Sequence, residues 1–306
     1  MSNVGRYIEL KKAGLTYREI AEQYGTSKDA VRNVIRRHNY KTYGSYTVQG
    51  SFTPKDSAPT KDVKILILDV EAAPATAWVW QARTEYVPMS QLLETNRIIC
   101  WAAKWLDGPT MFSSEWDHGR ESMLRAVWRL LDEADIVITY NGDNYDIPFL
   151  NWEFKQIGLN RYRPFKSIDL IKTVRKHFRP MYKKLDFLAQ SILGERKIDN
   201  GGIQLWKDLL LDGLEPAKKL MREYNKTDVT ITEDLYLDLL EWIDNHPPVK
   251  FSEDEVLCRA CGSDDLIHVG WKTALLLRYP LYKCTTCNSF SRTTRGRERI
   301  TNVYGV

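Results

Sequence analysis

The sequence predicts an α/β fold, in which a mixed sheet carries helices on its faces between a small all-helical segment and a small β-rich one. Three observations support this architecture. A continuous apolar run at 65–70 is typical of a strand covered on both faces. Strand and helix patterns follow it, and helices then dominate to about residue 245. Two Cys-x-x-Cys pairs mark a separate segment near the C-terminus.

The composition is that of a globular protein with a sizeable core. The chain has 306 residues, 43% of them hydrophobic and 27% charged, which is enough for about two to three domains. No apolar run is long enough for a membrane span, and the first residues have no apolar signal core. We therefore expect a cytoplasmic protein without membrane contact.

The net charge of +4 is unevenly distributed along the chain. Residues 1–60 carry a net +5, residues 61–249 a net −4 and residues 250–306 a net +3. Basic ends around an acidic centre indicate nucleic-acid contacts at the ends and clustered carboxylates between them. Solvated charge on three unrelated surfaces is the alternative.

Residues 1–43 predict three short helices. Gly25 ends the second, and Thr26 or Ser27 can cap the third. The pattern is typical of a helix-turn-helix whose last helix contacts DNA, and a small helical bundle that binds protein is the alternative. The candidate DNA-binding side chains share one face of that last helix: Lys28, Arg32, Arg36 and Arg37. Residues 44–62, rich in Gly, Ser, Thr and Pro, predict a linker.

Residues 63–246 predict the α/β domain. After the first strand, two more strands are predicted at 75–82 and 96–108. Their tryptophans are expected to pack in the core, with stacking on nucleic-acid bases as the alternative. These tryptophans are Trp78, Trp80, Trp101 and Trp105. The elements that follow are a helix, a strand and a helix, at 122–134, 135–141 and 147–158.

Residues 251–306 predict a small β-rich zinc ribbon with a basic tail. Four thiolates in two Cys-x-x-Cys pairs suit one tetrahedral Zn²⁺, and a closed site of this kind is structural. The ligands would be Cys258, Cys261, Cys284 and Cys287. Nucleic acid and protein are both open as partners of the ribbon. The fifth cysteine, Cys100, is expected in the apolar core.

Four acids and a tyrosine could meet at the rim of the sheet. Asp69 and Glu71 are two residues apart on a strand and therefore share one face. Asp146 follows a later strand, and Tyr224 and Asp228 are four apart on a predicted helix. Carboxylates that converge repel one another unless cations lie between them. Oxygen ligands suit Mg²⁺ or Mn²⁺, and two such ions can clamp the reacting oxygens of a phosphoryl transfer.

Three short motifs carry a resemblance to a known family. They are "DVE" at 69–71, "YNGDNYDIPFL" at 140–150 and "YNKTD" at 224–228. In this order they resemble the exonuclease motifs of the DEDD superfamily. The likeness is greatest to the 3′–5′ proofreading domain of family B DNA polymerases and its stand-alone bacterial and phage relatives. The resemblance covers about residues 63–245 and implies a ribonuclease H-like fold.

The resemblance also implies a role for each acid. Asp69 would bridge two Mg²⁺ or Mn²⁺ ions. Glu71 and Asp228 would help to hold the ion that activates water, and Asp146 would support the second ion. Tyr224 marks the tyrosine subtype, DEDDy, and would orient the attacking water. Together these five residues form the predicted catalytic set.

Substrate contacts are implied in the same way. Asn141 and Tyr145 match positions that contact the substrate strand, and Ala72 and Ala73 follow the first motif where the family lines the terminal nucleotide. Nine Lys and Arg residues between positions 161 and 184 could follow a phosphate backbone, and a solvated helix face is the alternative. The cationic candidates for substrate binding are Arg175, Lys183 and Lys184.

The sequence therefore predicts a metal-dependent 3′–5′ exonuclease that releases nucleoside 5′-monophosphates from single-stranded DNA. Since no polymerase-sized segment follows residue 245, we expect a free-standing nuclease, or one that works with a separate polymerase or replication protein, in a bacterium or a phage-infected host. A 3′–5′ exoribonuclease is one alternative. A non-catalytic DNA-binding replication or regulatory protein, whose nuclease-like core is a scaffold, is the other.

Overall fold

The chain divides into two compact units. The core unit is Asp62–Pro247, and the second unit combines Met1–Lys61 with Pro248–Val306. The finer division into 1–43, 44–62, 63–246 and 251–306 stays a prediction. None of the described helices combines the length and the apolar character needed to cross a membrane. The computed structural model describes residues 3–12, 17–27, 30–31, 34, 63–84, 86–195, 198–199, 201–252, 255–274 and 276–299.

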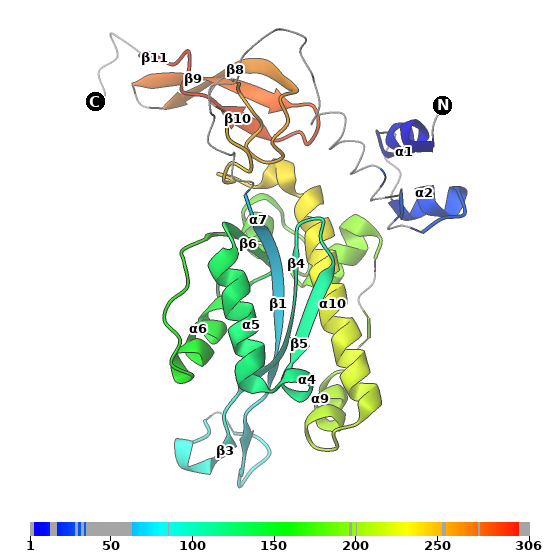
Figure 1. Ribbon diagram of the computed structural model, residues 1–306, viewed down its shortest axis with the longest axis vertical. Coiled ribbons are helices and arrows are strands. Elements are labelled where there is room, and N and C mark those ends of the chain that lie inside the picture. The colour runs from blue at the N-terminus through cyan, green and yellow to red at the C-terminus, as the bar shows by residue number, and fades with distance from the viewer. Residues whose placement is uncertain are drawn as a thin grey trace. The chain divides into compact units, whose positions relative to one another are not determined.

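The core unit is built on a mixed five-stranded sheet with the order β5-β4-β1-β6-β7 (Figure 1). Its strands are β1 (Ile65–Ala73), β4 (Arg97–Trp105), β5 (Thr110–Ser114), β6 (Ile136–Thr139) and β7 (Lys166–Asp169). Strands β5, β4 and β1 pair antiparallel, whereas β1, β6 and β7 are parallel. The C-terminal ends of the three parallel strands therefore lie at one end of the sheet, called here its carboxyl end. The predicted mixed α/β fold is confirmed.

One face of the sheet packs on α5 (Arg120–Glu133) and α6 (Asp146–Gln156). Leu66, Leu68 and Val70 of β1 belong to a single buried apolar cluster with these helices. Because strand side chains alternate between faces, the residues between them in β1 point the other way. This alternation determines on which side of the sheet the acidic residues of β1 lie.

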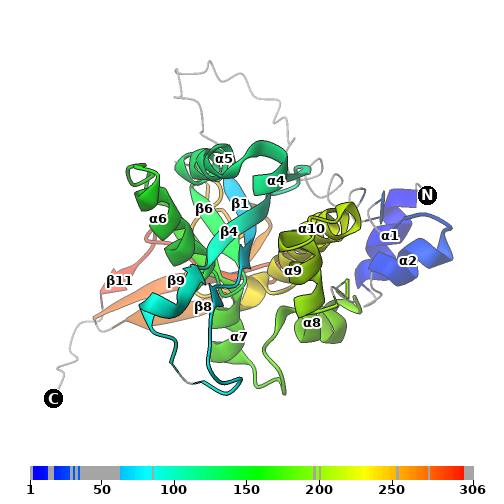
Figure 2. The same ribbon diagram turned by 90° about the horizontal axis from the view of Figure 1, so that it is seen from below.

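The opposite face packs on α9 (Ile203–Leu210) and α10 (Glu215–Asp238). Ala73 and Cys100 contribute to a second buried cluster there, together with Met221 of α10. Cys100 is fully buried, as predicted. Figures 1 and 2 show the sheet between the two pairs of helices.

A buried ion pair joins α10 to β4. Lys104 Nζ lies 2.7 Å from Glu233 Oε2, and both side chains are almost inaccessible to solvent. Glu233 Oε1 also accepts a hydrogen bond from the backbone N–H of Asp107 at 3.2 Å. Breaking such a buried pair by removing one partner costs about 3–5 kcal/mol, so the pair holds the long helix against the sheet.

The segment after β1 differs from the predicted strand at 75–82. Only β2 (Thr76–Ala77) is a strand there, and it pairs with β3 (Leu92–Glu94), which follows the short helix η1 (Met89–Gln91). The predicted core packing is wrong for Trp78 and Trp80, because the chain leaves the sheet and no described element covers them. It is confirmed for the other two, since Trp101 is buried and Trp105 packs against the first cluster.

Short elements complete the core unit. They are α4 (Glu115–His118), α7 (Leu170–His177), α8 (Leu185–Leu188), η2 (Ala189–Leu193) and η3 (Leu240–Trp242). Helix α7 begins directly after β7, where the side chain of Asp169 caps it by accepting the N–H of Ile171.

The N-terminal segment contains α1 (Asn3–Lys12) and α2 (Tyr17–Gln23). These helices pack around Tyr7, Ile20 and Val31. The helix-turn-helix itself stays a prediction. The predicted DNA-binding residues Lys28, Arg32, Arg36 and Arg37 lie outside the described residues.

The C-terminal segment contains an antiparallel sheet in which β9 pairs with the three other strands. The strands are β8 (Leu266–Ala274), β9 (Leu277–Cys284), β10 (Phe290–Arg292) and β11 (Glu298–Arg299). The first cysteine pair precedes β8, and the second begins at the last residue of β9. The pairing of β8 with β9 therefore brings the two Cys-x-x-Cys turns together.

Candidate active site

The centre of the candidate site is a cluster of three carboxylates from β1 and α10. Asp69 and Glu71 alternate with Val70, so both point to the face that α10 covers. Asp228 of α10 reaches the same place and is buried. One carboxylate oxygen of each acid lies within 4.8 Å of the others. The register of β1 against β4 shifts between Glu71 and Ala72, and bulges of this kind are over-represented next to active sites.

The cluster has the chemistry of a divalent cation site. Three carboxylates at this separation repel one another, and a cation between them would offset the repulsion. Ligand sets made only of oxygen suit Mg²⁺ and Mn²⁺ rather than softer metals. Asp69, Glu71 and Asp228 are therefore the residues that would hold a metal here.

Tyr224 lies one helical turn before Asp228 and is hydrogen-bonded to it. Burial raises the pKa of Tyr224 far above its usual value, and the charges of Asp228, Glu71 and Asp69 raise it further. The phenol therefore stays protonated at neutral pH. Its hydroxyl can donate to a carboxylate while its oxygen accepts a hydrogen bond from a water molecule.

Asn225 was not among the predicted site residues, although it stands inside the third motif. Its Nδ2 donates to Asp69 Oδ2 at 2.7 Å, and the side chain is fully buried. Its Oδ1 is also buried and has no hydrogen-bond partner within the described residues. Asn225 therefore orients the Asp69 carboxylate from the neighbouring helix. Its position next to Tyr224 was the signal that could have revealed it.

Asp146 lies beside the cluster and outside it. Its Oδ1 accepts the backbone N–H of Val70 at 3.0 Å, between the two acids of β1, and the side chain is 4% exposed. Burial raises the pKa of Asp146 to about 7, the hydrogen bond from Val70 opposes the rise, and the charge of Asp169 adds to it. A cation nearby would favour the ionised form.

The Asp146→Asn variant is expected to be more stable than the wild type in the absence of metal above pH 7. The pKa of Asp146 rises from 3.8 to about 7 on folding. The free energy of unfolding of the wild type therefore falls as pH increases from about 4 to about 7, because the unfolded chain releases this proton first. The difference should reach at most about 4 kcal/mol at pH 8. Urea unfolding of the core unit in EDTA at pH 5 and pH 8 measures it.

The exposed Asp186→Asn variant is the matched control, because it makes the same substitution at the surface of the same unit. If Asp146→Asn gained the same stability at both pH values, the carboxyl of Asp146 would not be perturbed in the folded protein.

A tight turn carries Asp146 from the end of β6 to the start of α6. Asn141 has φ of 66°, and its N–H donates to Asp169 Oδ1 at 2.7 Å. Asp169 Oδ2 accepts the N–H of Asp143 at 3.3 Å. Asp169, which was not among the predicted site residues, thus holds the turn from the end of the parallel neighbour β7. The available signal was an acid at the end of a strand, as for Asp146.

The Gly142→Ala variant is expected to distort this turn. An added Cβ would lie 2.4 Å from both Cβ and Oγ1 of Thr139, which is too close for any side chain. We expect a loss of about 1–3 kcal/mol in the free energy of unfolding. We also expect a loss of up to about 100-fold in any hydrolytic activity, since displacing Asp146 by about 1 Å suffices for that.

The control for this variant is Gly158→Ala. Gly158 has φ of 74° and no atom within 4 Å of an added Cβ. The Gly158→Ala variant therefore introduces backbone strain of about 1–2 kcal/mol without a steric clash. Urea unfolding and a nuclease rate should show similar stability losses for the two variants but an activity loss only for Gly142→Ala. Equal activity in both would contradict the steric argument.

The other predicted substrate residues differ in accessibility. Tyr145 is about half exposed and packs edge-to-face on Phe149. Burial raises the pKa of Tyr145, and the neighbouring acids Glu71, Asp146 and Asp69 raise it further. The backbone oxygen of Ala72 accepts a hydrogen bond from Trp206 Nε1 at 2.9 Å. Ala73 is buried in the apolar cluster described above.

The predicted cationic residues Arg175, Lys183 and Lys184 are exposed. Among the described side chains they form no ion pair, whereas Lys172 pairs with Asp143 and Lys176 with Asp244. Tyr140 donates a hydrogen bond to the backbone oxygen of Lys183 at 2.5 Å. This bond ties the chain around the two lysines to the turn that carries Asp146.

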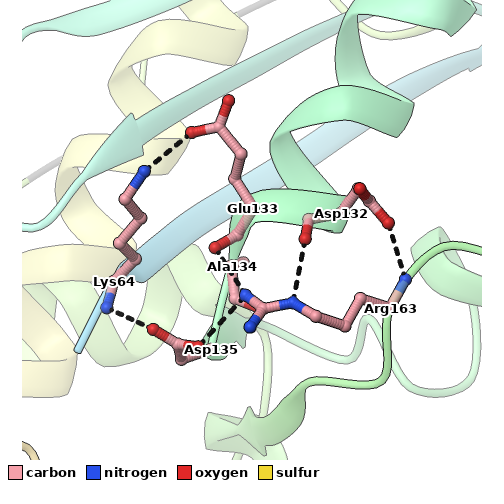
Figure 3. A network of polar contacts seen from close by, with 6 residues as sticks. All are labelled: Lys64, Asp132, Glu133, Ala134, Asp135 and Arg163. Atoms are coloured by element: carbon pink, nitrogen blue, oxygen red, sulfur yellow. Dashed lines mark hydrogen bonds and ion pairs between the residues drawn. The ribbon is translucent and has the colours of Figure 1, made fainter. Parts of the chain in front are cut away.

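Arg163, in the same cationic stretch, has a structural role (Figure 3). Its guanidinium donates to the backbone oxygens of Asp132 and Glu133 at 3.1 and 2.9 Å and forms an ion pair with Asp135. Lys64 joins the same network through Glu133 and Asp135. The network fixes the end of α5, so Arg163 is engaged within the protein.

The four cysteines of the C-terminal segment form a second candidate metal site. Their sulfur atoms all lie within 4.8 Å of one another. Cys258 and Cys287 sulfurs are 3.6 Å apart, as are those of Cys261 and Cys284. Tetrahedral Zn²⁺ with Zn–S bonds of about 2.3 Å requires sulfurs about 3.8 Å apart. The cluster therefore fits one zinc ion.

Comparison with protein families found a match that lies within the core unit. Residues 94–240 match the RNase_H superfamily. The matched region contains Asp146, Tyr224 and Asp228, and it begins after Asp69 and Glu71. The match supports a nuclease function for the domain.

Comparison with solved structures found, among others, the family B DNA polymerase from the hyperthermophilic archaeon Pyrobaculum calidifontis. The two chains share 18% sequence identity with a TM-score of 0.45. The alignment covers 63% of this chain and 26% of the polymerase, so the chain spans about a quarter of that protein. A search of curated proteins found no match.

Proposed function

We propose that the chain is a metal-dependent 3′–5′ exonuclease that removes nucleoside 5′-monophosphates from single-stranded DNA. The observation that carries this proposal is the convergence of Asp69, Glu71 and Asp228 within 4.8 Å. Carboxylates from a strand and a helix that are far apart in sequence repel one another at this separation, and a cation between them would offset that repulsion. The superfamily match over residues 94–240 supports hydrolysis of nucleic acid.

In this proposal two divalent cations would stabilise the charge that develops on the attacking and leaving oxygens. Asp69, Glu71 and Asp228 would hold them, with Asp146 supporting the second. Asn225 keeps the Asp69 carboxylate in position through its 2.7 Å hydrogen bond. The protonated hydroxyl of Tyr224 would orient the attacking water toward the phosphorus.

The substrate strand would reach this point along the exposed residues around it. Asn141 and Tyr145 would contact the substrate strand. Ala72 would line the terminal nucleotide, and the buried Ala73 would support Ala72 from the core. The exposed charges of Arg175, Lys183 and Lys184 would attract the phosphates. The N-terminal segment and a zinc-loaded C-terminal segment would add contacts to DNA or to a separate polymerase.

The test is digestion of 5′-labelled single-stranded DNA and matching RNA with Mn²⁺. A ladder that shortens from the 3′ end and disappears in EDTA is the expected result. A substrate with a phosphorothioate at its last linkages is the control and should resist digestion. A ladder on RNA alone would assign an exoribonuclease, and intact DNA and RNA with folded protein would overturn the proposal.

A further inference from the structure

The segment between β2 and β3, residues 78–91, exposes large apolar side chains to an unusual degree. Trp78, Trp80, Tyr86 and Met89 are 73%, 94%, 76% and 80% exposed. Single exposed apolar residues are ordinary on protein surfaces, whereas several in one short segment mark an interaction site. Residues 78–91 form the aromatic segment.

Backbone hydrogen bonds hold the aromatic segment in place. Trp78 N–H donates to the backbone oxygen of Gln91 at 2.9 Å, and Gln91 N–H donates to that of Pro88 at the same distance. Thr84 Oγ1 donates to the backbone oxygen of Tyr86 at 2.9 Å. The pairing of β2 with β3 closes the base of the segment. The exposure of its rings therefore belongs to a defined hairpin.

The aromatic segment adjoins the candidate active site through the chain itself. Strand β1 ends at Ala73, two residues after Glu71, and β2 begins at Thr76. In Figure 1 the hairpin, in cyan, extends beyond the carboxyl end of β1. Trp206 fixes the end of β1 by donating to the backbone oxygen of Ala72. A strand that approaches the three carboxylates from this end would pass the aromatic segment.

We propose that the aromatic segment stacks on bases of the single strand that enters the active site. This inference rests on the proposed function. Aromatic faces bind every base, because each base has a π-face, and they do so without selecting sequence. That suits an enzyme that must hold a strand as it shortens. The continuity of the segment with the catalytic strand favours nucleic acid over a protein partner.

The test places 2-aminopurine, a base whose fluorescence is quenched by stacking, at successive positions from the 3′ end of a single-stranded oligonucleotide. The full, zinc-loaded chain is mixed with each oligonucleotide without added Mg²⁺ or Mn²⁺, so that no cleavage occurs. We expect quenching at positions 5′ to the terminal nucleotide. A Trp78→Ala/Trp80→Ala variant should lose that quenching and bind the strand about 10- to 100-fold more weakly.

The matched control is Trp152→Ala, which removes a tryptophan that is 60% exposed on α6. It should leave both quenching and affinity unchanged. If the double variant does not fold, Trp80→Ala alone replaces it, because a side chain that is 94% exposed contributes little packing. Circular dichroism verifies folding of each variant.

Quenching and affinity that are equal in the double variant and the wild type would overturn the inference and leave a protein as the occupant. Absence of any quenching with the wild type would also overturn it. Because binding is measured without added Mg²⁺ or Mn²⁺, the result is separate from the digestion assay. A digestion ladder without quenching would support the exonuclease and contradict the stacking. Quenching without a ladder would support the stacking and contradict the exonuclease.

Discussion

The Asp228→Asn variant is expected to release terminal nucleotides at least about 100-fold more slowly than the wild type. Loss of a group that merely supports a metal ligand already costs about 10- to 100-fold, and Asp228 belongs to the carboxylate cluster itself. The substitution keeps the shape of the side chain and removes its charge. Single-turnover rates over a Mn²⁺ titration measure the effect, with partial recovery expected at high Mn²⁺.

Glu223→Gln is the control for this experiment. Glu223 is exposed on the same helix, one residue before Tyr224, so its substitution removes an equal charge at a distance from the cluster. Its rate should match that of the wild type. If Asp228→Asn digests DNA as fast as Glu223→Gln, Asp228 does not hold a catalytic metal and the proposed mechanism is wrong.

Cys258→Ser is expected to have the largest effect on stability. It should reduce bound zinc from one ion per chain to none and unfold the sheet formed by β8–β11. Cys258 is buried between the other three cysteines, and zinc binding contributes about 10–16 kcal/mol to the folding of small zinc domains. Zinc content by mass spectrometry and proteolysis of residues 255–299 measure the two effects.

Cys100→Ala is the matched control, since Cys100 belongs to an apolar cluster of the core unit and is not one of the four clustered cysteines. It should retain one zinc ion per chain and a C-terminal segment that resists proteolysis. A Cys258→Ser variant that also retained its zinc would show that the four sulfurs do not form the metal site, whatever their separation.

The elements that could be predicted from sequence are those with a clear periodic pattern. The apolar run of β1 indicates a central strand, and the amphipathic pattern of α5 indicates a helix on the sheet. Asp69 and Glu71 share a face because the period of a strand is two, and Tyr224 and Asp228 do so because they are four apart on a helix. In the structure one carboxylate oxygen from each of Asp69, Glu71 and Asp228 lies within 4.8 Å of the others.

Features that depend on distant neighbours could not be predicted in this way. Trp78 and Trp80 alternate with smaller residues, as in a buried strand, and they are exposed because no element among the described residues covers them. Asn225 looks like any polar residue of a helix until β1 lies against it. Asp169 serves the turn at Asn141 because β7 is the parallel neighbour of β6, and this pairing is a property of topology.

The hydrogen bond between Asn225 and Asp69 joins residues 156 positions apart in the chain. During translation β1 is synthesised early and α10 much later, so the carboxylate cluster cannot assemble on a nascent chain before most of the core unit has left the ribosome. Contacts of such long range also form late in folding, because loop closure must come first. The proposed hydrolytic activity is thereby tied to completion of the core unit, because the carboxylate cluster exists only once α10 lies against β1.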